Sequence, residues 1–321
     1  MTILVTGAAG FLGTRLIEAL LAPPEAASAA TRIVAADITP PTVDDPRIVS
    51  RTGNVVDPSF IDSIVASDTA VVFHLAAVLS GQSEAEFDVG MKTNVDATRV
   101  LLEACARLAK PTRFVFSSSI AVFGGPLPEV VPDDMALRPQ SSYGTAKAIG
   151  ELMVADYSRR GWIDGVSCRL PTVAIRPGRP NSAMSSFVSG IVREPLAGID
   201  AVCPVPLDIR MWITSPGVVT RNLLHAGQMP TGDLNGRRSF NLPGLTVTPA
   251  QMLDSLERLA GPAVRARVRQ QVDDRMMRVV STWPGAFDTK HALAAGFCAD
   301  AGIDALIASY MREAGIQART V

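Results

Sequence analysis

The sequence has few of the residues that mark metal centres, disulfide scaffolds or membrane spans. Its 321 residues include three histidines, four cysteines and only 5% aromatic residues. The cysteines are widely spaced and form no Cys-x-x-Cys pair, so we expect neither a metal site nor a disulfide framework. No apolar run is long enough to span a bilayer, and the chain opens with a strand-like segment where a signal peptide would stand. These features predict a cytoplasmic protein.

The sequence also lacks an excess of either charge. Thirty Lys and Arg residues stand against 31 Asp and Glu residues, for a formal net charge of −1. A strongly basic or acidic balance would suggest nucleic acid or an anionic membrane as partner, and we predict neither. The chain is long enough to bury the core of one large or two smaller domains.

A glycine-rich segment, TGAAGFLG, runs from Thr6 to Gly13 between an apolar run at residues 3–5 and a helical pattern at residues 11–21. Gly7 permits a tight turn, Gly10 lets the backbone approach a phosphate, and Gly13 lets the helix pack close to the strand. The free N–H groups of the helix N-terminus would face a pyrophosphate. This order of strand, turn and helix predicts a dinucleotide-binding site.

A second strand-like run, at residues 32–36, ends at Asp37. A carboxylate at this strand end accepts hydrogen bonds from the adenosine ribose hydroxyls and repels a 2′-phosphate. Asp37 therefore predicts NAD, in preference to NADP, as the cofactor.

Strand-like runs alternate with helical stretches through the first half of the chain. The runs lie at residues 47–51, 70–76, 113–117 and 165–170, and the helical stretches at residues 84–108 and 143–159. This alternation predicts an α/β Rossmann fold, a doubly wound parallel sheet covered on both faces. Beyond residue 171 the alternation stops. We predict an NAD-binding Rossmann domain of residues 1–171 plus about 217–242, and a smaller mixed α/β substrate lid domain of residues 172–216 and 243–321.

Tyr143 and Lys147 stand four residues apart in a helical pattern and so share one face. A tyrosine with the ordinary pKa of about 10 is a poor base at neutral pH, but a neighbouring ammonium favours its phenolate. Ser119, at the end of a predicted strand, is placed to align a substrate hydroxyl. Together with a dinucleotide-binding site, Ser119, Tyr143 and Lys147 predict a hydride-transfer enzyme.

These motifs, together with HLAA at residues 74–77, Asn94, SSSIAVFG at residues 117–124 and RLP at residues 169–171, resemble the extended short-chain dehydrogenase/reductase family. This family holds NAD-dependent epimerases and dehydratases. The resemblance implies that Ser119, Tyr143 and Lys147 are catalytic, that His74 is structural and that the protein forms a homodimer. It also implies a set of NAD-binding positions: Gly7, Gly10, Phe11, Leu12, Gly13, Asp37, Asn54, Val55, Leu75, Ala76, Ala77, Asn94, Tyr143, Lys147, Pro171 and Val173. Asn54 departs from the family, which usually has Asp there.

The segments that distinguish branches of the family favour a small substrate. Thr172 stands where sugar-nucleotide epimerases have an asparagine, and Ile120 and Ala121 replace the acidic pair of dehydratases. Residues 79–83 and 169–195 resemble instead the branch that oxidises D-erythronate, a four-carbon acid sugar. The implied reaction is NAD-dependent oxidation of the C2 hydroxyl to a 2-oxo acid.

A small carboxylate substrate favours an arginine, which can bind it at two points. Of the arginines at residues 176, 179, 193 and 210, we favour Arg179 and Arg210. The predicted substrate contacts are Ser80, Ser119, Tyr143, Thr172, Arg179, Asn181 and Arg210. Two other interpretations stay open: a nucleotide-sugar epimerase or reductase, and a non-catalytic NAD sensor, although sensors usually lose the Tyr or the Lys.

Overall fold

The computed structural model describes residues 1–22, 31–178, 184–232, 234 and 236–317. The chain forms two compact units. The first unit consists of Met1–Val122, Pro139–Arg169 and Thr220–Phe240, and the second of Phe123–Arg138, Leu170–Val219 and Asn241–Val321.

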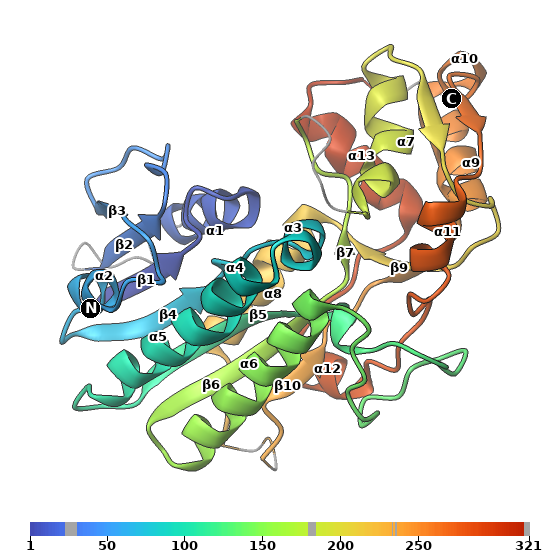
Figure 1. Ribbon diagram of the computed structural model, residues 1–321. Coiled ribbons are helices and arrows are strands. Elements are labelled where there is room, and N and C mark those ends of the chain that lie inside the picture. Colours follow the sequence, from blue (N-terminus) through green and yellow to red (C-terminus); the bar gives the residue numbers. More distant parts are fainter. Residues whose placement is uncertain (23–30, 179–183, 233, 235, 318–321) are drawn as a thin grey trace. The chain divides into compact units, whose positions relative to one another are not determined.

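The first unit is built on a seven-stranded sheet in the order β10-β6-β5-β4-β1-β2-β3 (Figure 1). The strands are β1 (Thr2–Thr6), β2 (Arg32–Asp37), β3 (Ile48–Thr52), β4 (Thr69–His74), β5 (Thr112–Ser119), β6 (Ile163–Leu170) and β10 (Ser239–Asn241). β1 pairs in parallel with β2 and β4, β2 with β3, and β4 with β5. Apart from β10 at the edge, which lies in the segment 217–242 that we assigned to this domain, this is the strand order of a Rossmann fold. The predicted fold class is confirmed.

Helices cover both faces of this sheet. They are α1 (Phe11–Leu21), α2 (Pro58–Ile64), α3 (Ser80–Ala85), α4 (Phe87–Met91), α5 (Ala97–Ala106), α6 (Ser142–Arg159) and α8 (Pro216–Gln228), which begins in the second unit. Val72 of β4 packs in one buried cluster with Leu101 of α5 and Val154 of α6. The next strand residue, Phe73, points to the other face. There its ring lies so close to Gly227 of α8 that a Cβ atom on the glycine would approach it to 2.6 Å.

The stretch predicted to be helical at residues 84–108 is helical over most of its length, but it is not one uninterrupted α-helix: it contains the end of α3, then α4, a π-helical turn and α5. α3 and α4 are separated at Glu86, whose backbone leaves the helical conformation with φ −129° and ψ 70°. A π-helical turn, η1 (Lys92–Asp96), then stands between α4 and α5. The apolar pattern does not reveal these breaks because it reports which face is buried and not the local hydrogen bonding.

The second unit holds two small sheets and the remaining helices. A mixed sheet contains β7 (Thr172–Val173), β9 (Met211–Thr214) and β11 (Leu245–Val247), and a parallel pair contains β8 (Ala201–Cys203) and β12 (Val268–Gln270). The helices are α7 (Ser186–Leu196), α9 (Pro249–Ala260), α10 (Pro262–Arg265), α11 (Asp274–Val280), α12 (Lys290–Ala294) and α13 (Ile303–Glu313). Apolar side chains of α7, α9 and α13 pack together in its core, including Val188, Met252 and Ile307.

Residues 123–138 belong to the second unit, whereas we expected them in the first domain. The Val131 N–H donates to the Ala286 carbonyl at 2.9 Å, and the Asp288 N–H donates to the Val131 carbonyl at 2.8 Å. Asp133 also pairs with His291, at 3.0 Å from Oδ2 to Nδ1. These partners are more than 150 residues away in the sequence, so no local pattern could assign the segment.

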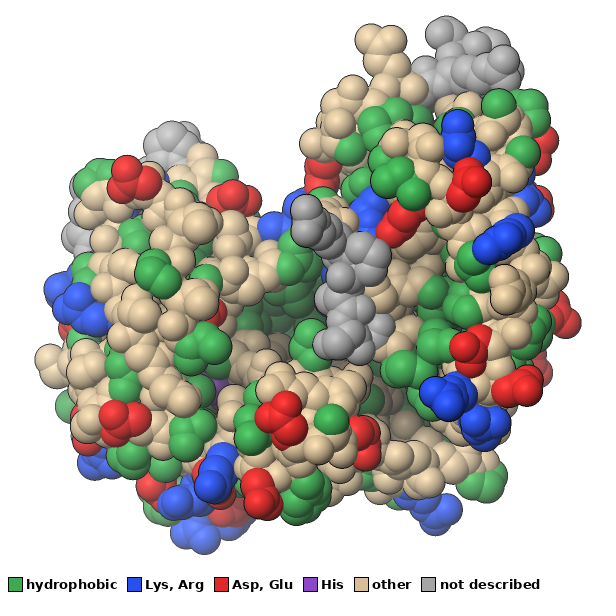
Figure 2. Space-filling view, turned by 45° about the horizontal axis from the view of Figure 1, so that its top comes forward, with side chains coloured by type: hydrophobic (Ala, Val, Ile, Leu, Met, Phe, Trp, Pro, Cys, Tyr) green, Lys and Arg blue, Asp and Glu red, His purple; other side chains and the backbone are tan. Residues whose placement is uncertain are grey.

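On the face seen in Figure 2, acidic and basic side chains are interspersed with hydrophobic and polar ones. None of the helices in the described ranges combines the length and the apolar character that crossing a membrane requires.

Candidate active site

The glycine turn between β1 and α1 is shaped by close backbone contacts. Gly7 has φ +71°, and a Cβ atom there would lie 2.7 Å from the backbone nitrogen of Ala76. A Cβ atom at Gly13 would lie 2.1 Å from the Gly7 carbonyl oxygen, and one at Gly10 would lie 3.1 Å from it. The first turn of α1, which starts at Phe11 and Leu12, carries no acidic residue. The turn therefore fits a pyrophosphate, with an open backbone and a helix N-terminus free of competing carboxylates.

Asp37 lies at the end of β2 and is bonded to this turn. Its Oδ2 accepts a hydrogen bond from the Ala9 N–H at 3.0 Å, and its Oδ1 accepts one from the Thr39 N–H at 3.1 Å. The Asp37 carbonyl accepts from the Gly53 N–H at 2.9 Å, next to Asn54 and the buried Val55. The structure thus brings together the glycine turn, Asp37, which is predicted to bind the ribose, and two further predicted NAD-binding positions, Asn54 and Val55.

The end of β4 is held by Thr6 and by Asn94. The Leu75 N–H donates to the Thr6 carbonyl at 3.1 Å, and the Ala76 N–H to the Thr6 hydroxyl at 3.4 Å. The Asn94 side chain, inside the π-helical turn, bonds both backbone groups of Val78: its Oδ1 accepts from the N–H at 2.8 Å and its Nδ2 donates to the carbonyl at 3.0 Å. Asn94 therefore fixes the path of the segment from Ala77 to Ser80, the first residue of α3.

His74 has both ring nitrogens occupied. The Thr98 hydroxyl donates to the Asn94 carbonyl at 2.8 Å, so it accepts from Nε2 of His74 at 2.9 Å. Nδ1 is then left to accept from the Thr6 hydroxyl at 2.7 Å. Burial, and to a smaller degree the Lys147 charge, lowers the pKa of His74 to about 3. A neutral, enclosed imidazole joins β1, β4 and α5 and does not act as a base at neutral pH.

Ser119, Tyr143 and Lys147 come from two neighbouring elements of the first unit. Ser119 is the last residue of β5, and its hydroxyl accepts from the Ala121 N–H at 3.1 Å. α6 carries Tyr143 and Lys147 in its first two turns. A Cβ atom at Gly144 would lie 2.1 Å from the Ala121 carbonyl oxygen, so the start of α6 lies directly against the turn that follows Ser119.

The Lys147 ammonium sits among aromatic rings in the interior. Its Nζ lies 5.6 Å from the centre of the Tyr143 ring and 4.8 Å from that of Phe116. Lys147 is only 2% exposed. Burial lowers its pKa from 10.5 to about 7, while the carboxylate of Glu151 acts in the opposite direction. Its charge can therefore respond to small changes in its surroundings near neutral pH.

Glu151 is a residue of this site that the sequence analysis missed. It lies one helical turn after Lys147, a spacing that was a usable signal. Its carboxylate binds Arg169, with 2.7 Å between Arg169 Nη2 and Glu151 Oε2, and also accepts a hydrogen bond from the Ser118 hydroxyl. Ser118 directly precedes the candidate catalytic serine.

The second-unit residues that we predicted to contact NAD or the substrate lie in different surroundings. Thr172 and Val173, which follow the buried Pro171, form β7 and pair with Ile213 and Thr214 of β9. Arg179 and Asn181 lie outside the described residues. Among the alternatives, Arg193 is 7% exposed and donates to the Arg176 carbonyl at 2.8 Å, so it braces the backbone of its own unit.

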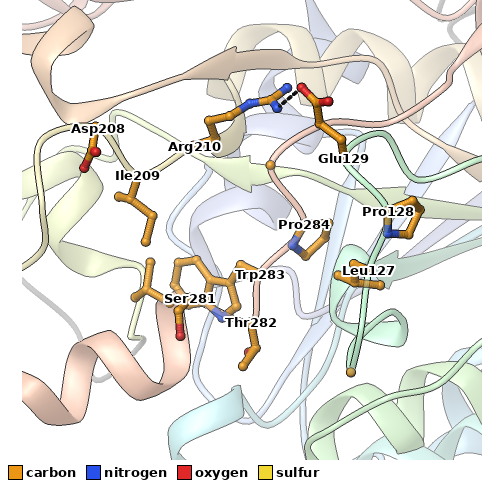
Figure 3. A pocket seen from close by; sticks show the side chains of 13 residues that line it. Leu127, Pro128, Glu129, Asp208, Ile209, Arg210, Ser281, Thr282, Trp283 and Pro284 are labelled. Carbon is orange, nitrogen blue, oxygen red and sulfur yellow. Dashed lines mark hydrogen bonds and ion pairs between the residues drawn. The ribbon is translucent and has the colours of Figure 1, made fainter.

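Arg210 lines a pocket of about 370 Å³ in the second unit (Figure 3). The pocket is formed by residues 125, 127–129, 208–210 and 280–285. Nη1 of Arg210 donates to Oε1 of Glu129 at 2.7 Å, and the Trp283 side chain forms part of the wall. An arginine has five N–H donors, so Arg210 can hold this carboxylate and still bind another anion.

Cys105 and Cys168 offer no reactive thiolate, and the described residues offer no metal site. Burial raises the pKa of the Cys105 and Cys168 thiols to about 12, so both stay protonated. Within the described ranges, His, Cys, Asp and Glu side chains nowhere gather in a group of three that could hold a metal ion.

Known proteins are similar to this chain over nearly its whole length. The profile of the NAD dependent epimerase/dehydratase family matches residues 3–229. The D-erythronate dehydrogenase of Cupriavidus necator is 48% identical over 98% of this chain and 99% of that protein, and that of Haemophilus influenzae is 42% identical over 97% and 99%. The crystal structure described as the nucleoside-diphosphate-sugar epimerase of Agrobacterium tumefaciens is 36% identical, covers 98% of this chain and 94% of its own, and superposes with a TM-score of 0.93. With a fitting dinucleotide turn, a Tyr-Lys helix and a profile match over most of its length, the chain belongs to the NAD-dependent epimerase/dehydratase family of extended short-chain dehydrogenases/reductases.

Proposed function

We propose that this protein is an NAD-dependent dehydrogenase that oxidises the C2 hydroxyl of D-erythronate to the 2-oxo acid. The observation that carries the proposal is the 48% identity with a D-erythronate dehydrogenase over nearly the whole of both chains. The match spans both units, including the segments of the second unit where substrate binding is expected. The intact Ser119, Tyr143 and Lys147 support an oxidoreductase over a non-catalytic NAD sensor.

In this proposal the side chains of the first unit move the proton. The Tyr143 phenolate takes the proton of the C2 hydroxyl while the carbon–oxygen double bond forms. Lys147 stabilises the phenolate through its charge, and Ser119 holds the substrate oxygen by a hydrogen bond. The glycine turn and Asp37 would hold NAD, which would supply the acceptor for the hydride that leaves C2.

The substrate carboxylate needs a cation with directed donors, and we assign this role to Arg210 with Arg179. For Arg210, the proposal is supported by its place in a pocket together with its unused N–H donors. Ser80, Thr172 and Asn181 are the proposed partners of the sugar hydroxyls.

A second candidate function is a nucleotide-sugar epimerase or reductase. It is favoured by the 36% identity and the TM-score of 0.93 with the structure described as a nucleoside-diphosphate-sugar epimerase. In that case Arg210 would bind a diphosphate in place of a carboxylate.

The test is NADH formation by the purified protein with NAD and a panel of acid sugars. The panel contains D-erythronate, L-threonate, D-threonate, glycerate and a hexuronate, with a uridine diphosphate sugar assayed separately for epimerisation. Selective turnover of D-erythronate supports the proposal. Silence across the acid sugars with NAD still bound overturns it, and conversion of the nucleotide sugar would establish the second candidate.

We also propose that the protein is a cytoplasmic homodimer. None of its described cysteines forms a disulfide, as suits a reducing compartment. The dimer is supported by exposed apolar side chains on α4 and α6, namely Phe87, Val89 and Leu152.

A further inference from the structure

Glu151 forms a buried ionic junction between three elements of the first unit. It is 3% exposed and lies on α6. Nε of Arg169, from β6, donates to its Oε1 at 2.9 Å and to its Oε2 at 3.1 Å, and Nη2 of Arg169 donates to Oε2 at 2.7 Å. The Ser118 hydroxyl, from β5, donates to Oε1. One carboxylate thus ties together the helix of Tyr143 and Lys147 and the strand that ends in Ser119.

A contribution to folding stability does not by itself explain this buried ion pair. Removing two charges from water is costly, and well-packed apolar side chains of similar volume often serve as well or better. The surrounding core is apolar and supplies such packing, with Phe116 and Val154 both buried nearby in the same cluster. An ion pair at this position therefore calls for a role in addition to packing.

That role is suggested by the groups that face Lys147 from each neighbouring element. Phe116 of β5 and Tyr143 of α6 present their rings. His74 of β4 is close enough for the Lys147 charge to affect it, but it is neutral. Glu151, on α6, supplies the negative field that opposes the effect of burial on Lys147.

We propose that Glu151 is a positioning residue of the active site, which keeps Lys147 as an ammonium ion and holds the end of β5 against α6. The inference rests on the proposed function for its catalytic consequence, because it assumes that Tyr143 works as a phenolate. The effect of the Glu151 charge on Lys147, and through Lys147 on Tyr143, does not depend on which substrate is bound.

The substitution Glu151→Gln removes the carboxylate charge and keeps nearly the same shape. The pKa of Lys147 then falls further, since burial is no longer opposed, and Arg169 loses the Glu151 carboxylate as its ion-pair partner. Lys147 loses its proton more readily at neutral pH and stabilises the Tyr143 phenolate less. We therefore expect the acid limb of the kcat/KM profile to move to higher pH by about one unit.

Ultraviolet titration of tyrosinate in the NAD-bound protein tests, without a substrate, whether Glu151 affects the ionisation of Tyr143. The chain contains three tyrosines, and burial raises the pKa of both Tyr157 and Tyr310. The first tyrosinate to appear as pH rises is thus expected from Tyr143, and its absence in Tyr143→Phe identifies it. In Glu151→Gln this signal should move to higher pH by the same amount as the acid limb.

Two variants control for a purely structural effect. Glu151→Asp keeps the charge and should retain the wild-type titration while lowering thermal stability. Ser118→Ala removes one hydrogen bond and no charge, so it should behave in the same way. If Glu151→Gln does not fold because Arg169 has lost the Glu151 carboxylate, the double variant Glu151→Gln/Arg169→Met removes that cation too, and the titration is made on the double variant.

An unchanged tyrosinate titration and acid limb in the charge-free variant, with only a loss of rate or stability, would overturn the inference. Failure of the proposed function is separate, since it appears as silence of the wild-type protein on the acid-sugar panel. The tyrosinate titration can still be made in that event.

Discussion

At the scale of single residues, the site depends on charges held in an apolar interior. Lys147 lies beside two aromatic rings with its pKa lowered to about 7, and His74 is kept neutral between Thr6 and Thr98. Burial makes the charged forms of both side chains unfavourable for folding. Substitutions at this site should therefore affect activity and folding stability differently.

Substitution Tyr143→Phe should remove the proton acceptor, while NAD should still bind through the glycine turn and Asp37. General base catalysis contributes roughly 10²- to 10⁴-fold, so we expect turnover to fall at least about 100-fold. NADH formation measures the loss, and titration calorimetry with NAD provides the control. Turnover close to wild type with normal NAD binding would rule out Tyr143 as the base.

Substitution Lys147→Met should abolish activity and yet stabilise the fold below neutral pH. The folded-state pKa of Lys147 is about 7 against 10.5 for the free group, so the native protein binds fewer protons than the unfolded chain between these values. Wild-type stability therefore rises with pH across this window relative to the variant, by on the order of a few kcal/mol. The variant's advantage is largest below pH 7 and disappears as pH approaches 10.5.

Calorimetric melting of both proteins at several pH values measures this difference. Lys290→Met is the matched control, because the Lys290 side chain is 84% exposed and should give no such trend. A difference in Tm between wild type and Lys147→Met that stays constant from pH 6.5 to 9.5, roughly the window of the shift, would contradict the prediction.

At the scale of elements, glycine determines how closely α6 approaches its neighbours. At Gly150 a Cβ atom would lie 2.4 Å from the Phe116 ring, and at Gly144 one would lie 2.1 Å from the Ala121 carbonyl. These contacts place the helix with Tyr143 and Lys147 on the strand and turn that carry Ser119. The site geometry is thus a consequence of helix–strand packing and not of the catalytic residues alone.

Substitution Gly144→Ala tests this dependence. Alanine in a helix is ordinarily favoured over glycine by about 1 kcal/mol, but here the added methyl meets a backbone oxygen and the sign reverses. We expect destabilisation by about 1–3 kcal/mol. A shift of α6 on the ångström scale should also lower kcat by roughly 100-fold.

Urea denaturation and steady-state kinetics measure these two effects. Gly232→Ala is the control, because nothing lies within 4 Å of a Cβ atom at that position. Wild-type stability and kcat in Gly144→Ala would show that α6 can move away from the turn at no cost.

At the scale of the whole molecule, the chain alternates between its two units. Residues 123–138 leave the first unit after β5 and return to it before α6, so the connection between Ser119 and Tyr143 is part of the second unit. The proposed homodimer belongs to the same scale, because its apolar face combines α4 and α6.

Substitution Leu152→Glu should convert the proposed dimer to a monomer. Leu152 is 67% exposed near the middle of α6, and a charge there would be buried without a partner in a dimer interface. Analytical ultracentrifugation measures the mass of both proteins. Ile199→Glu, at a residue 58% exposed in the second unit, should leave the dimer intact. A monomeric wild-type protein, or a variant that stays dimeric, would contradict the prediction.

Much of the first unit was predictable because its signals are local. An apolar run, a glycine turn and a helical pattern within about 20 residues specify the start of a Rossmann fold. Each glycine is needed because the backbone is tightly packed there and leaves no room for a side chain. Tyr143 and Lys147 were found in the same way, by their spacing on one helix. Family membership followed from the order of these motifs along the chain.

The fold class, the dinucleotide turn and the Tyr-Lys pair could thus be predicted, because all of them depend on neighbours in the chain. Three contacts became visible only in the folded molecule: Glu151 with Ser118 and Arg169, Arg210 with Glu129, and residues 123–138 with the rest of the second unit. These contacts join residues far apart in the sequence. Their partners are selected by packing and by the need to pair buried charges, which leave no periodic signal in a single chain.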